Sequence, residues 1–264
     1  MRNDFETLFL EHIDRHILLV TLDRPEAANA MNTRMGLDLM ELFEGLLLNL
    51  EDVRVVIVTG RGEKAFCAGG DLKERKGMSD AAWQSQHVIF ERMVRALMGC
   101  PVPLIACVNG AAYGGGCEVA AAADFVYAST NARFALTEVT LGIMPGAGGT
   151  QNLPRAVGER RAQELILTGA PFSAEEAEKW GLVNKVLPPE GLRDAALATA
   201  RRIAGNGPIA VRQAKQAIRR GLQMSIWDGL AYEIEAYNRM VPTEDRREGV
   251  LAYNERRKPN FRGL

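Results

Sequence analysis

The stretch NGAAYGGGCE, residues 109–118, combines three consecutive glycines with a nearby glutamate. Glycine runs are poor helix or strand interior, because glycine loses the most backbone freedom on folding and has no side chain to bury. An apolar run precedes the glycines at 103–108, and an alanine-rich segment follows at 119–123. The pattern predicts a strand, a glycine turn and the start of a helix. The N–H groups at such a helix start favour a negative charge.

Length and composition limit the class of protein. The chain has 264 residues, of which 47% are hydrophobic and 25% charged, as in a globular protein with one large domain or a domain and a small appendage. The formal net charge of −1 gives no reason to expect nucleic acid or an anionic membrane as a partner. Residues 1–6 are polar and acidic, unlike a signal peptide, and no apolar run could span a bilayer. We therefore expect a cytoplasmic protein, or a mature form already trimmed.

The cysteines and histidines give no sign of a metal centre. Cys67, Cys100, Cys107 and Cys117 form no CxxC pair, and the chain has only 3 histidines. We therefore expect no metal and reduced thiols. Cys67 and Cys117 are interpreted as small packing residues and not as nucleophiles.

The order of the expected elements indicates an α/β protein. Strands are predicted at 5–10, 16–22, 53–59, 104–108, 125–128 and 182–187, and helices at 33–50, 79–98, 155–167 and 173–181. Four further helices are predicted at 192–204, 208–221, 225–240 and 243–257. The prediction is a β/α spiral or layered core over 1–190, followed by an all-helical region over 191–264. No internal repeat is evident in the sequence.

Two loops of small residues, 66–71 and 114–116, each follow a predicted buried strand. Small residues let a carbonyl group approach backbone N–H groups, and two N–H donors aimed at one point form an oxyanion hole. The alternative is that both loops are tight turns packed against each other. Because each loop lies beside a candidate acid, the catalytic interpretation is favoured.

Glu118 and Glu138 each lie next to a glycine-rich turn and an apolar run. Paired carboxylates near apolar walls can have separated pKa values, which gives one acid and one base. Composition alone supports a second interpretation equally well, in which both glutamates are surface residues or form structural ion pairs.

Two other motifs do not support a phosphate site. The segment 146–150 (GAGGT) lacks the lysine of a P-loop and misses the GxGxxG spacing. Arg212, Lys215, Arg219 and Arg220 share a predicted helix face. Such a face is usually solvated, with phosphate contact as the alternative.

At these motifs the sequence resembles the enoyl-CoA hydratase/isomerase (crotonase) superfamily along essentially its whole length. The matching motifs are KAFCAGGDLKE at 64–74, the stretch 108–118, Glu138 with LGIMPG at 141–146, and GGTQ with LPR between 148 and 155. The resemblance implies a spiral of ββα units with a C-terminal helical trimerisation region. Homotrimers, or hexamers built as dimers of trimers, are implied with it.

The resemblance also implies a coenzyme A thioester substrate, with no separate cofactor. Its carbonyl oxygen would accept hydrogen bonds from Gly70 and Gly115. Members that hydrate a 2-enoyl thioester carry two catalytic glutamates, which match Glu118 and Glu138. Glu118 would help to deprotonate the water that adds to C3, and Glu138 would deliver a proton to C2.

Further residues are implied to bind the coenzyme and the acyl group. They are Ala27, Ala28, Ala68, Gly69, Gly70, Asp71, Leu72 and Lys73, with Tyr253 and Arg256 from a neighbouring subunit. Glu26 departs from the pattern, because several hydratases carry lysine there, and this shifts the expected phosphate contact to Arg24 or Lys73. The 72–98 region is expected to form part of the acyl pocket.

The predicted function is hydration of a trans-2-enoyl-CoA. Methylglutaconyl-CoA hydration is one alternative, because 71–75 and 242–246 resemble that branch, and Δ3-Δ2-enoyl-CoA isomerisation is another. RNA binding is disfavoured, since the net charge is low and the basic face is sparse.

Overall fold

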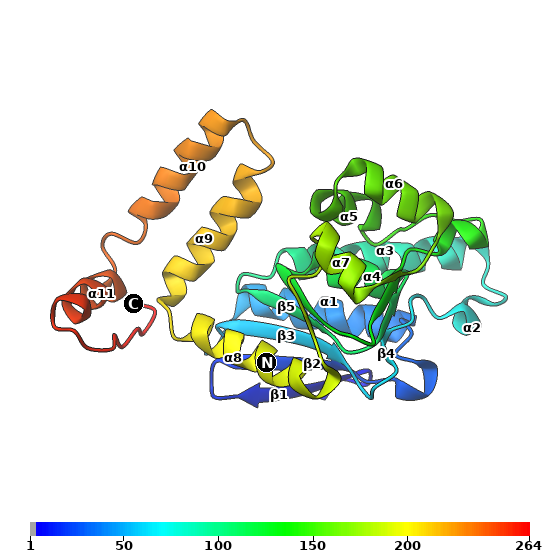
Figure 1. The fold of residues 1–264 in the computed structure, drawn as a ribbon, viewed down its shortest axis with the longest axis horizontal. Coiled ribbons are helices and arrows are strands. Elements are labelled where there is room, and N and C mark those ends of the chain that lie inside the picture. The colour runs from blue at the N-terminus through cyan, green and yellow to red at the C-terminus, as the bar shows by residue number, and fades with distance from the viewer. Residues whose placement is uncertain (1–3) are drawn as a thin grey trace.

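Two β-sheets form the centre of the fold in the computed structural model, which describes residues 4–264 (Figure 1). The larger sheet has the order β1-β2-β3-β5-β7-β10, and the smaller has the order β4-β6-β8-β9. The larger sheet contains β1 (Leu8–Ile13), β2 (Ile17–Leu22), β3 (Val55–Gly60), β5 (Leu104–Val108), β7 (Phe125–Ser129) and β10 (Lys185–Leu187). The smaller contains β4 (Ala65–Cys67), β6 (Ala111–Tyr113), β8 (Arg133–Ala135) and β9 (Phe172–Ser173).

Consecutive strands alternate between the two sheets. β3, β5 and β7 pair in parallel in the larger sheet, and β4, β6 and β8, which directly follow them, pair in parallel in the smaller one. Helix α3 (Asp80–Met98) comes after β4, and α4 (Gly115–Ala122) comes after β6. The chain therefore winds as a spiral of ββα units, which confirms the predicted α/β spiral.

The remaining helices surround these sheets. In the first part of the chain they are η1 (Pro25–Ala27), α1 (Thr33–Leu48), α2 (Leu72–Arg75) and η2 (Glu138–Leu141). They continue with α5 (Gly149–Val157), α6 (Glu159–Thr168), α7 (Ala174–Trp180) and α8 (Pro189–Ala204). The Asn32 side chain caps α1, and Ser173 and Glu176 form a capping box at the start of α7.

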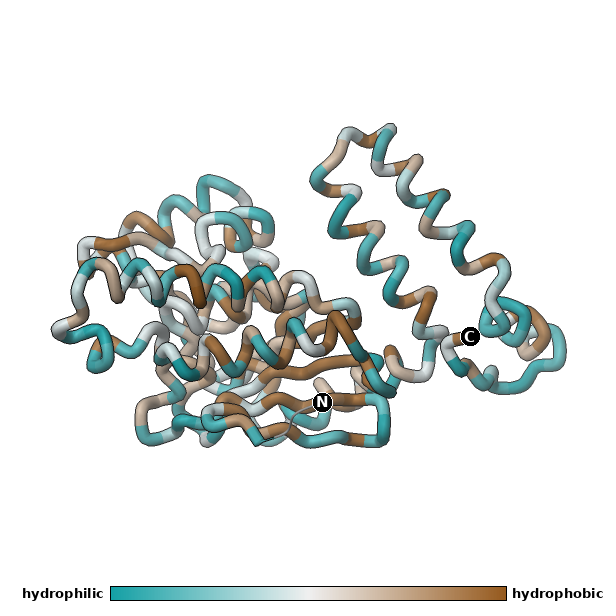
Figure 2. The backbone as a smooth tube through the Cα atoms, turned by 180° about the vertical axis from the view of Figure 1, so that it is seen from behind, coloured by the Kyte–Doolittle hydropathy of each residue, from teal (hydrophilic) through white to brown (hydrophobic). Residues whose placement is uncertain are grey.

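Strand β2 shows how the larger sheet is covered on both faces. All six of its residues are buried, and they alternate between two hydrophobic clusters. Leu18, Val20 and Leu22 join the cluster that includes α1 and α3, while Ile17 and Leu19 join the cluster under α8. Figure 2 shows the strands as the most apolar part of the trace. Helix α8 therefore packs on the larger sheet, although the sequence analysis groups it with the C-terminal helical region. The predicted division of the chain into 1–190 and 191–264 stays a prediction.

Three predicted segments differ in detail. The helix predicted at 155–167 is wrong as a single element, because the chain breaks at Gly158 (φ +81°) into α5 and α6. The first strand continues to Ile13, and a three-residue turn, Asp14 to His16, connects it to β2; Asp14 and Arg15 have positive φ. The last predicted strand is shortened to Lys185–Leu187.

Three C-terminal helices extend away from the sheets: α9 (Pro208–Gly221), α10 (Ile226–Asn238) and α11 (Glu244–Asn254). In Figure 1, α9 and α10 run side by side as an antiparallel pair, and α11 lies at the far end of the molecule. Their exposed apolar side chains include Ile218, Leu222, Ile226, Trp227, Leu230, Ile234, Tyr237, Val250, Leu251 and Tyr253.

Asp124, which follows α4, ties α9 to the core. Its carboxylate accepts hydrogen bonds from Lys215 Nζ at 2.6 Å and from Arg219 at 3.0 Å, and it also accepts the Leu104 N–H at 2.7 Å. Lys215 further donates to the Val102 carbonyl, and Arg219 donates to the carbonyl of Ala122. The expectation of a solvated basic face is therefore wrong for Lys215 and Arg219, because both cations are held by core acceptors.

We predict that Asp124→Asn lowers the free energy of unfolding by about 1–3 kcal/mol, because it leaves two partly buried cations without their anion. Urea unfolding measures this. The control is Asp14→Asn, whose partner Arg201 and own side chain are both more than half exposed, so a loss below about 1 kcal/mol is expected. Equal losses in the two variants would contradict the role given to Asp124.

Candidate active site

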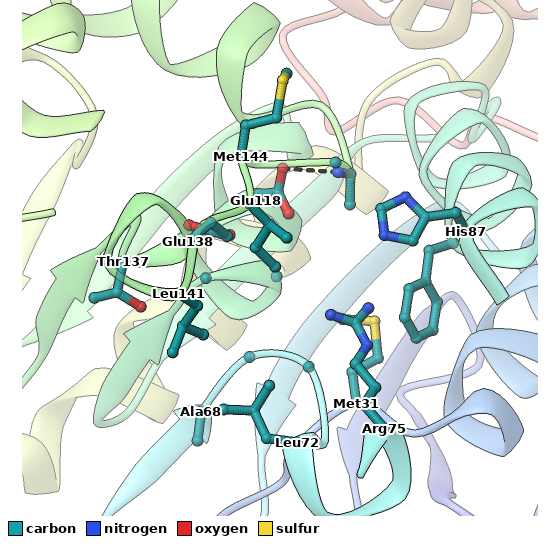
Figure 3. Close-up of a pocket in the computed structure, with 18 residues that line it drawn as sticks. Met31, Ala68, Leu72, Arg75, His87, Glu118, Thr137, Glu138, Leu141 and Met144 are labelled. Carbon is teal, nitrogen blue, oxygen red and sulfur yellow. Dashed lines mark hydrogen bonds between the residues drawn. The ribbon is translucent and has the colours of Figure 1, made fainter. Parts of the chain in front are cut away.

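A pocket brings the two glycine loops and the two glutamates together (Figure 3). Its walls come from the loop after β4, from α2 and α3, from the start of α4, and from η2 with the loop that follows it. The lining residues are Met31, Ala68, Gly69, Gly70, Leu72, Arg75, His87, Phe90, Gly114, Gly115, Glu118, Thr137, Glu138, Leu141, Ile143, Met144, Gly146 and Ala147.

Backbone pairing places the two loops at the same edge of the smaller sheet. β4 and β6 are parallel, so the loops that follow them leave the sheet in the same direction. The Gly70 nitrogen lies 3.9 Å from the position that a Cβ atom on Gly115 would occupy. Within residues 4–264 the Gly70 N–H has no backbone acceptor, and Gly115 is the first residue of α4, where an N–H has no helical partner. Two available N–H groups therefore lie next to each other.

The loops approach so closely that side chains are excluded. A Cβ atom on Gly116 would lie 2.1 Å from the Cys67 carbonyl oxygen. A Cβ atom on Gly69, which has φ +97°, would lie 2.8 Å from the Tyr113 carbonyl oxygen. The loops are therefore tight turns packed against each other, which was one interpretation. The same packing places their N–H groups at the pocket, as the other interpretation, an oxyanion hole, requires.

Glu118 lies one turn into α4 and is 3% exposed. Its Oε1 accepts hydrogen bonds from the backbone N–H groups of Ala147 and Gly149, both at 2.8 Å. Burial raises the pKa of Glu118 to about 7, and the nearby charge of Glu138 adds to this, while the two N–H donors oppose it. The glycine loop at 146–149 thus holds a carboxylate of the protein itself.

Glu138 begins η2 and is half-buried. Burial raises the pKa of Glu138, while the positive charge of Arg75 lowers it. Its Oε2 is buried and has no hydrogen-bond partner within the described residues. Neither Glu138 nor Glu118 makes an ion pair within residues 4–264, so the alternative of structural ion-pair glutamates finds no support there.

The residues expected to bind coenzyme A fall into two groups. The first group lines or flanks the pocket: Ala68, Gly69, Gly70 and Leu72 line it, and Asp71 and Lys73 are their neighbours in the chain. The Ala27–Ala28 loop lies beside this group, because the Ala28 carbonyl accepts the Ala68 N–H at 3.1 Å. Tyr253 and Arg256 are exposed at the end of α11, across the molecule from the pocket (Figure 1). Their contact with coenzyme A, which requires a neighbouring subunit, stays a prediction.

The two residues expected to contact the coenzyme phosphates, Arg24 and Lys73, differ in whether their charge is already paired. Arg24 donates to Asp71 at 3.0 Å and to the Ala30 carbonyl, so its charge is already paired. Lys73 is exposed and lies next to the pocket loop. Of the two, Lys73 is the one whose charge is open to a ligand.

Residues of the 72–98 region line the opposite wall of the pocket, as expected, but the sequence does not show which side chains face it. Arg75 ends α2, while His87 and Phe90 lie one turn apart on α3. Burial and the charge of Arg75 lower the pKa of His87. The spacing of His87 and Phe90 on a predicted helix is the one local signal that could have indicated a shared face.

The described residues contain neither a membrane-spanning helix nor a cluster of metal ligands. No helix within residues 4–264 has the length and apolarity to cross a membrane. No group of three or more histidine, cysteine, aspartate or glutamate side chains is arranged there to hold a metal ion.

We predict that Gly116→Ala strongly destabilises the fold, by about 2–4 kcal/mol, because the added methyl group overlaps the Cys67 carbonyl. The control is Gly45→Ala in α1, where an added Cβ meets nothing within 4 Å and where alanine should stabilise the helix by roughly 0.5–1 kcal/mol. Thermal and urea unfolding distinguish the two. A Gly116→Ala protein as stable as the wild type would rule out the close approach of the loops.

We predict that Glu118→Gln removes a pH dependence of stability. The folded protein holds the Glu118 proton up to about pH 7, against 4.5 for an ordinary glutamate, so this group's contribution to stability is lost as the pH rises from 4.5 through 7. The variant should therefore gain roughly 2–3 kcal/mol relative to the wild type between pH 5 and pH 8, measured by urea unfolding. The exposed Glu63→Gln serves as the control, with no pH-dependent difference expected. A constant difference for Glu118→Gln would refute the raised pKa.

Comparison with known proteins places this site in a family. The family model described as enoyl-CoA hydratase/isomerase matches residues 12–263. The short-chain-enoyl-CoA hydratase of Clostridium acetobutylicum is 44% identical over 242 residues, 92% of each chain. The 2,3-dehydroadipyl-CoA hydratase of Escherichia coli is 39% identical over 251 residues, 94% of this chain and 96% of that protein. The crystal structure of an enoyl-CoA hydratase from Bacillus anthracis, 42% identical, superimposes with a TM-score of 0.96 over 98% of this chain and 100% of the other. The chain therefore belongs to the enoyl-CoA hydratase/isomerase family and has its crotonase fold.

Proposed function

We propose that this protein is an enoyl-CoA hydratase, which adds water reversibly across a trans-2-enoyl-CoA to give a 3-hydroxyacyl-CoA. The observation that carries the proposal is one pocket that is lined by two carboxylates of raised pKa and by two adjacent backbone N–H groups. Named hydratases among the relatives support it. The chemistry needs a group that polarises the thioester, a base for water and an acid for C2, and the pocket supplies each of them.

The oxyanion hole consists of Gly70 and Gly115 in this proposal. The thioester carbonyl oxygen accepts hydrogen bonds from both N–H groups, and these strengthen as negative charge develops on that oxygen in the enolate. A donor of this kind typically contributes roughly 2.7–4 kcal/mol to lowering the barrier. Both donors belong to backbone that is fixed by close packing, so little reorganisation is needed during the reaction.

The two glutamates divide the proton transfers. Oε1 of Glu118 is held by Ala147 and Gly149, so its carboxylate is fixed in position as the base that takes a proton from the attacking water. The water oxygen bonds to C3 as Glu138 gives a proton to C2. The Oε2 atom of Glu138, buried and without a protein partner, is the atom that carries this proton. Transfer of one proton from Glu118 to Glu138 then restores the starting state.

The alternatives use the same pocket differently. An isomerase moves one proton and would need only one of the two carboxylates, so the presence of both favours hydration. Hydration of methylglutaconyl-CoA is the same chemistry on a branched acyl group and falls within the proposal. RNA binding loses support, since Lys215 and Arg219 are paired with Asp124.

We also propose that the protein assembles as a homotrimer or as a hexamer. The exposed apolar side chains of α9, α10 and α11 support this, because a surface of this kind is typical of a protein–protein interface. A neighbouring subunit would then bring Tyr253 and Arg256 to the coenzyme. A cytoplasmic location and the lack of any cofactor besides the substrate's own coenzyme A remain predictions.

We predict that Glu138→Gln lowers kcat for crotonyl-CoA by about 10²–10⁴-fold, because the amide cannot deliver the proton to C2. Loss of the conjugated thioester absorbance measures the reaction, and calorimetry with coenzyme A should show unchanged binding. Glu190→Gln, exposed on α8, is the matched control and should keep full activity. Full activity of Glu138→Gln would remove Glu138 from the mechanism.

A further inference from the structure

Arg75 brings a positive charge into the pocket that holds the two glutamates. Its side chain is half-buried and lies across the pocket from Glu118 and Glu138 (Figure 3). The guanidinium packs on the first glycine loop, because its Cζ lies 3.3 Å from the position that a Cβ atom on Gly70 would occupy. No carboxylate lies within 4.0 Å of the Arg75 nitrogen atoms in the described part of the chain. The charge therefore acts on the two glutamates through space and not in a direct ion pair.

A chain of side-chain contacts holds the guanidinium in this place. Arg75 Nε donates to Oε1 of Gln86 at 2.8 Å, and Gln86 is 3% exposed. The Nε2 group of Gln86 donates to Oε2 of Glu74 and to Oγ1 of Thr33, both at 2.8 Å. The ring of Trp83 lies 4.6 Å from Arg75 Cζ. Contacts from α2 and α3 thus give the charge of Arg75 a fixed position at the pocket.

The charged groups around the pocket act on one another. Burial lowers the pKa of Arg75, and three glutamate charges oppose this effect, those of Glu74, Glu118 and Glu138. Burial raises the pKa of Glu118 and of Glu138, and the charge of Arg75 opposes it in both cases. His87 on α3 also faces Arg75, and burial and the Arg75 charge lower the pKa of its imidazole. A neutral side chain at position 75 would therefore leave both pocket glutamates with a higher affinity for protons.

We propose that Arg75 is a positioning residue of the hydration reaction, whose permanent charge keeps the pair of Glu118 and Glu138 in the state that carries one proton at neutral pH. This inference rests on the proposed hydratase function. With two protons the pair has no base for the water, and with none it has no acid for C2. Burial disfavours each negative charge and so favours the doubly protonated state. A cation held nearby favours ionisation, and because it forms no direct ion pair, it takes up none of the carboxylate oxygen atoms.

The first experiment measures kcat/KM for crotonyl-CoA against pH in the wild type and in Arg75→Met. The profile should be bell-shaped, because its two limbs report the two apparent pKa values of the glutamate pair. Removing the cation raises both values, so both limbs should move to higher pH by about one pH unit, at the low end of the roughly 1–3 expected for a direct ion pair. Arg75→Lys keeps the charge and should return the limbs most of the way. Arg92→Met, an exposed arginine of α3 paired with Glu44, is the control and should keep the wild-type profile.

The shape of the profile separates this role from a structural one. A lower maximum with unmoved limbs would overturn the inference, because Arg75 would then act on packing or on the thioester oxygen. The same movement of the limbs is expected when Arg75→Met is combined with His87→Gln. If the movement disappears in that background, His87 is the group that titrates and the inference fails.

A titration without turnover separates this inference from the hydratase proposal. NMR of protein labelled at its glutamate carboxyl carbons follows the two glutamates directly, with Glu118→Gln and Glu138→Gln to assign the signals. Arg75→Met should raise both pKa values by about one pH unit. If the wild type hydrates no enoyl-CoA, the hydratase proposal fails while this titration still tests Arg75. Unchanged glutamate titrations in an Arg75→Met protein that is folded by urea unfolding would overturn the inference.

Discussion

The approach of Gly116 to the Cys67 carbonyl is the constraint on which the rest of the site depends. A Cβ atom there would lie only 2.1 Å from that oxygen, so only glycine permits the contact. The contact holds the loop after β4 against the loop after β6, and it thereby brings the N–H groups of Gly70 and Gly115 together. Because β4 and β6 pair in parallel, the loops that follow them leave the sheet in the same direction. Because Gly69 and Gly116 have no side chains, the two loops can approach closely. The pair of donors is thus a consequence of backbone packing and needs no side chain to form it.

Helix α4 connects the glycine loop to the first carboxylate, Glu118. The helix begins at Gly115, so its first N–H groups face the pocket, and one turn later it places Glu118 on the same side. The α4 position alone would leave that carboxylate buried and without partners. The N–H groups of Ala147 and Gly149 come from a loop about thirty residues further along the chain, and they fix its orientation. Burial therefore raises the pKa of Glu118 without leaving the side chain disordered, which is the condition that a general base near neutral pH requires.

The sequence predicted what local pattern controls and missed what distant contacts control. The glycine turn, the strand at 104–108, the caps and the two glutamates were all predictable, because each depends on residues adjacent in the chain. The glycines at 146–149 match a family motif and lack the features of a phosphate loop, but nothing local shows that N–H groups of this loop meet Glu118. The sequence indicates a solvated face for Lys215 because its partner, Asp124, lies far away in the chain, between α4 and β7. The ββα repeat left no trace in the sequence, because strand pairing needs apolar residues of suitable length and not identical ones.

The two sides of the pocket are held in different ways: one by close packing of the backbone, the other by contacts between side chains. The side that carries the Gly70 and Gly115 N–H groups is fixed by backbone sterics, where any side chain would disturb it. The opposite side is formed by side chains of α2 and α3, and the buried Gln86 accepts the hydrogen bond that orients one of them, Arg75. The two meet at Asp71, which follows Gly70 and caps α2, so the segment that holds the Gly70 N–H also positions Arg75 one turn later. The backbone packing of Gly116 on Cys67 does not involve the Arg75 side chain, whereas the guanidinium of Arg75 lies against Gly70, so the segment 70–75 is where the two sides of the pocket come into contact.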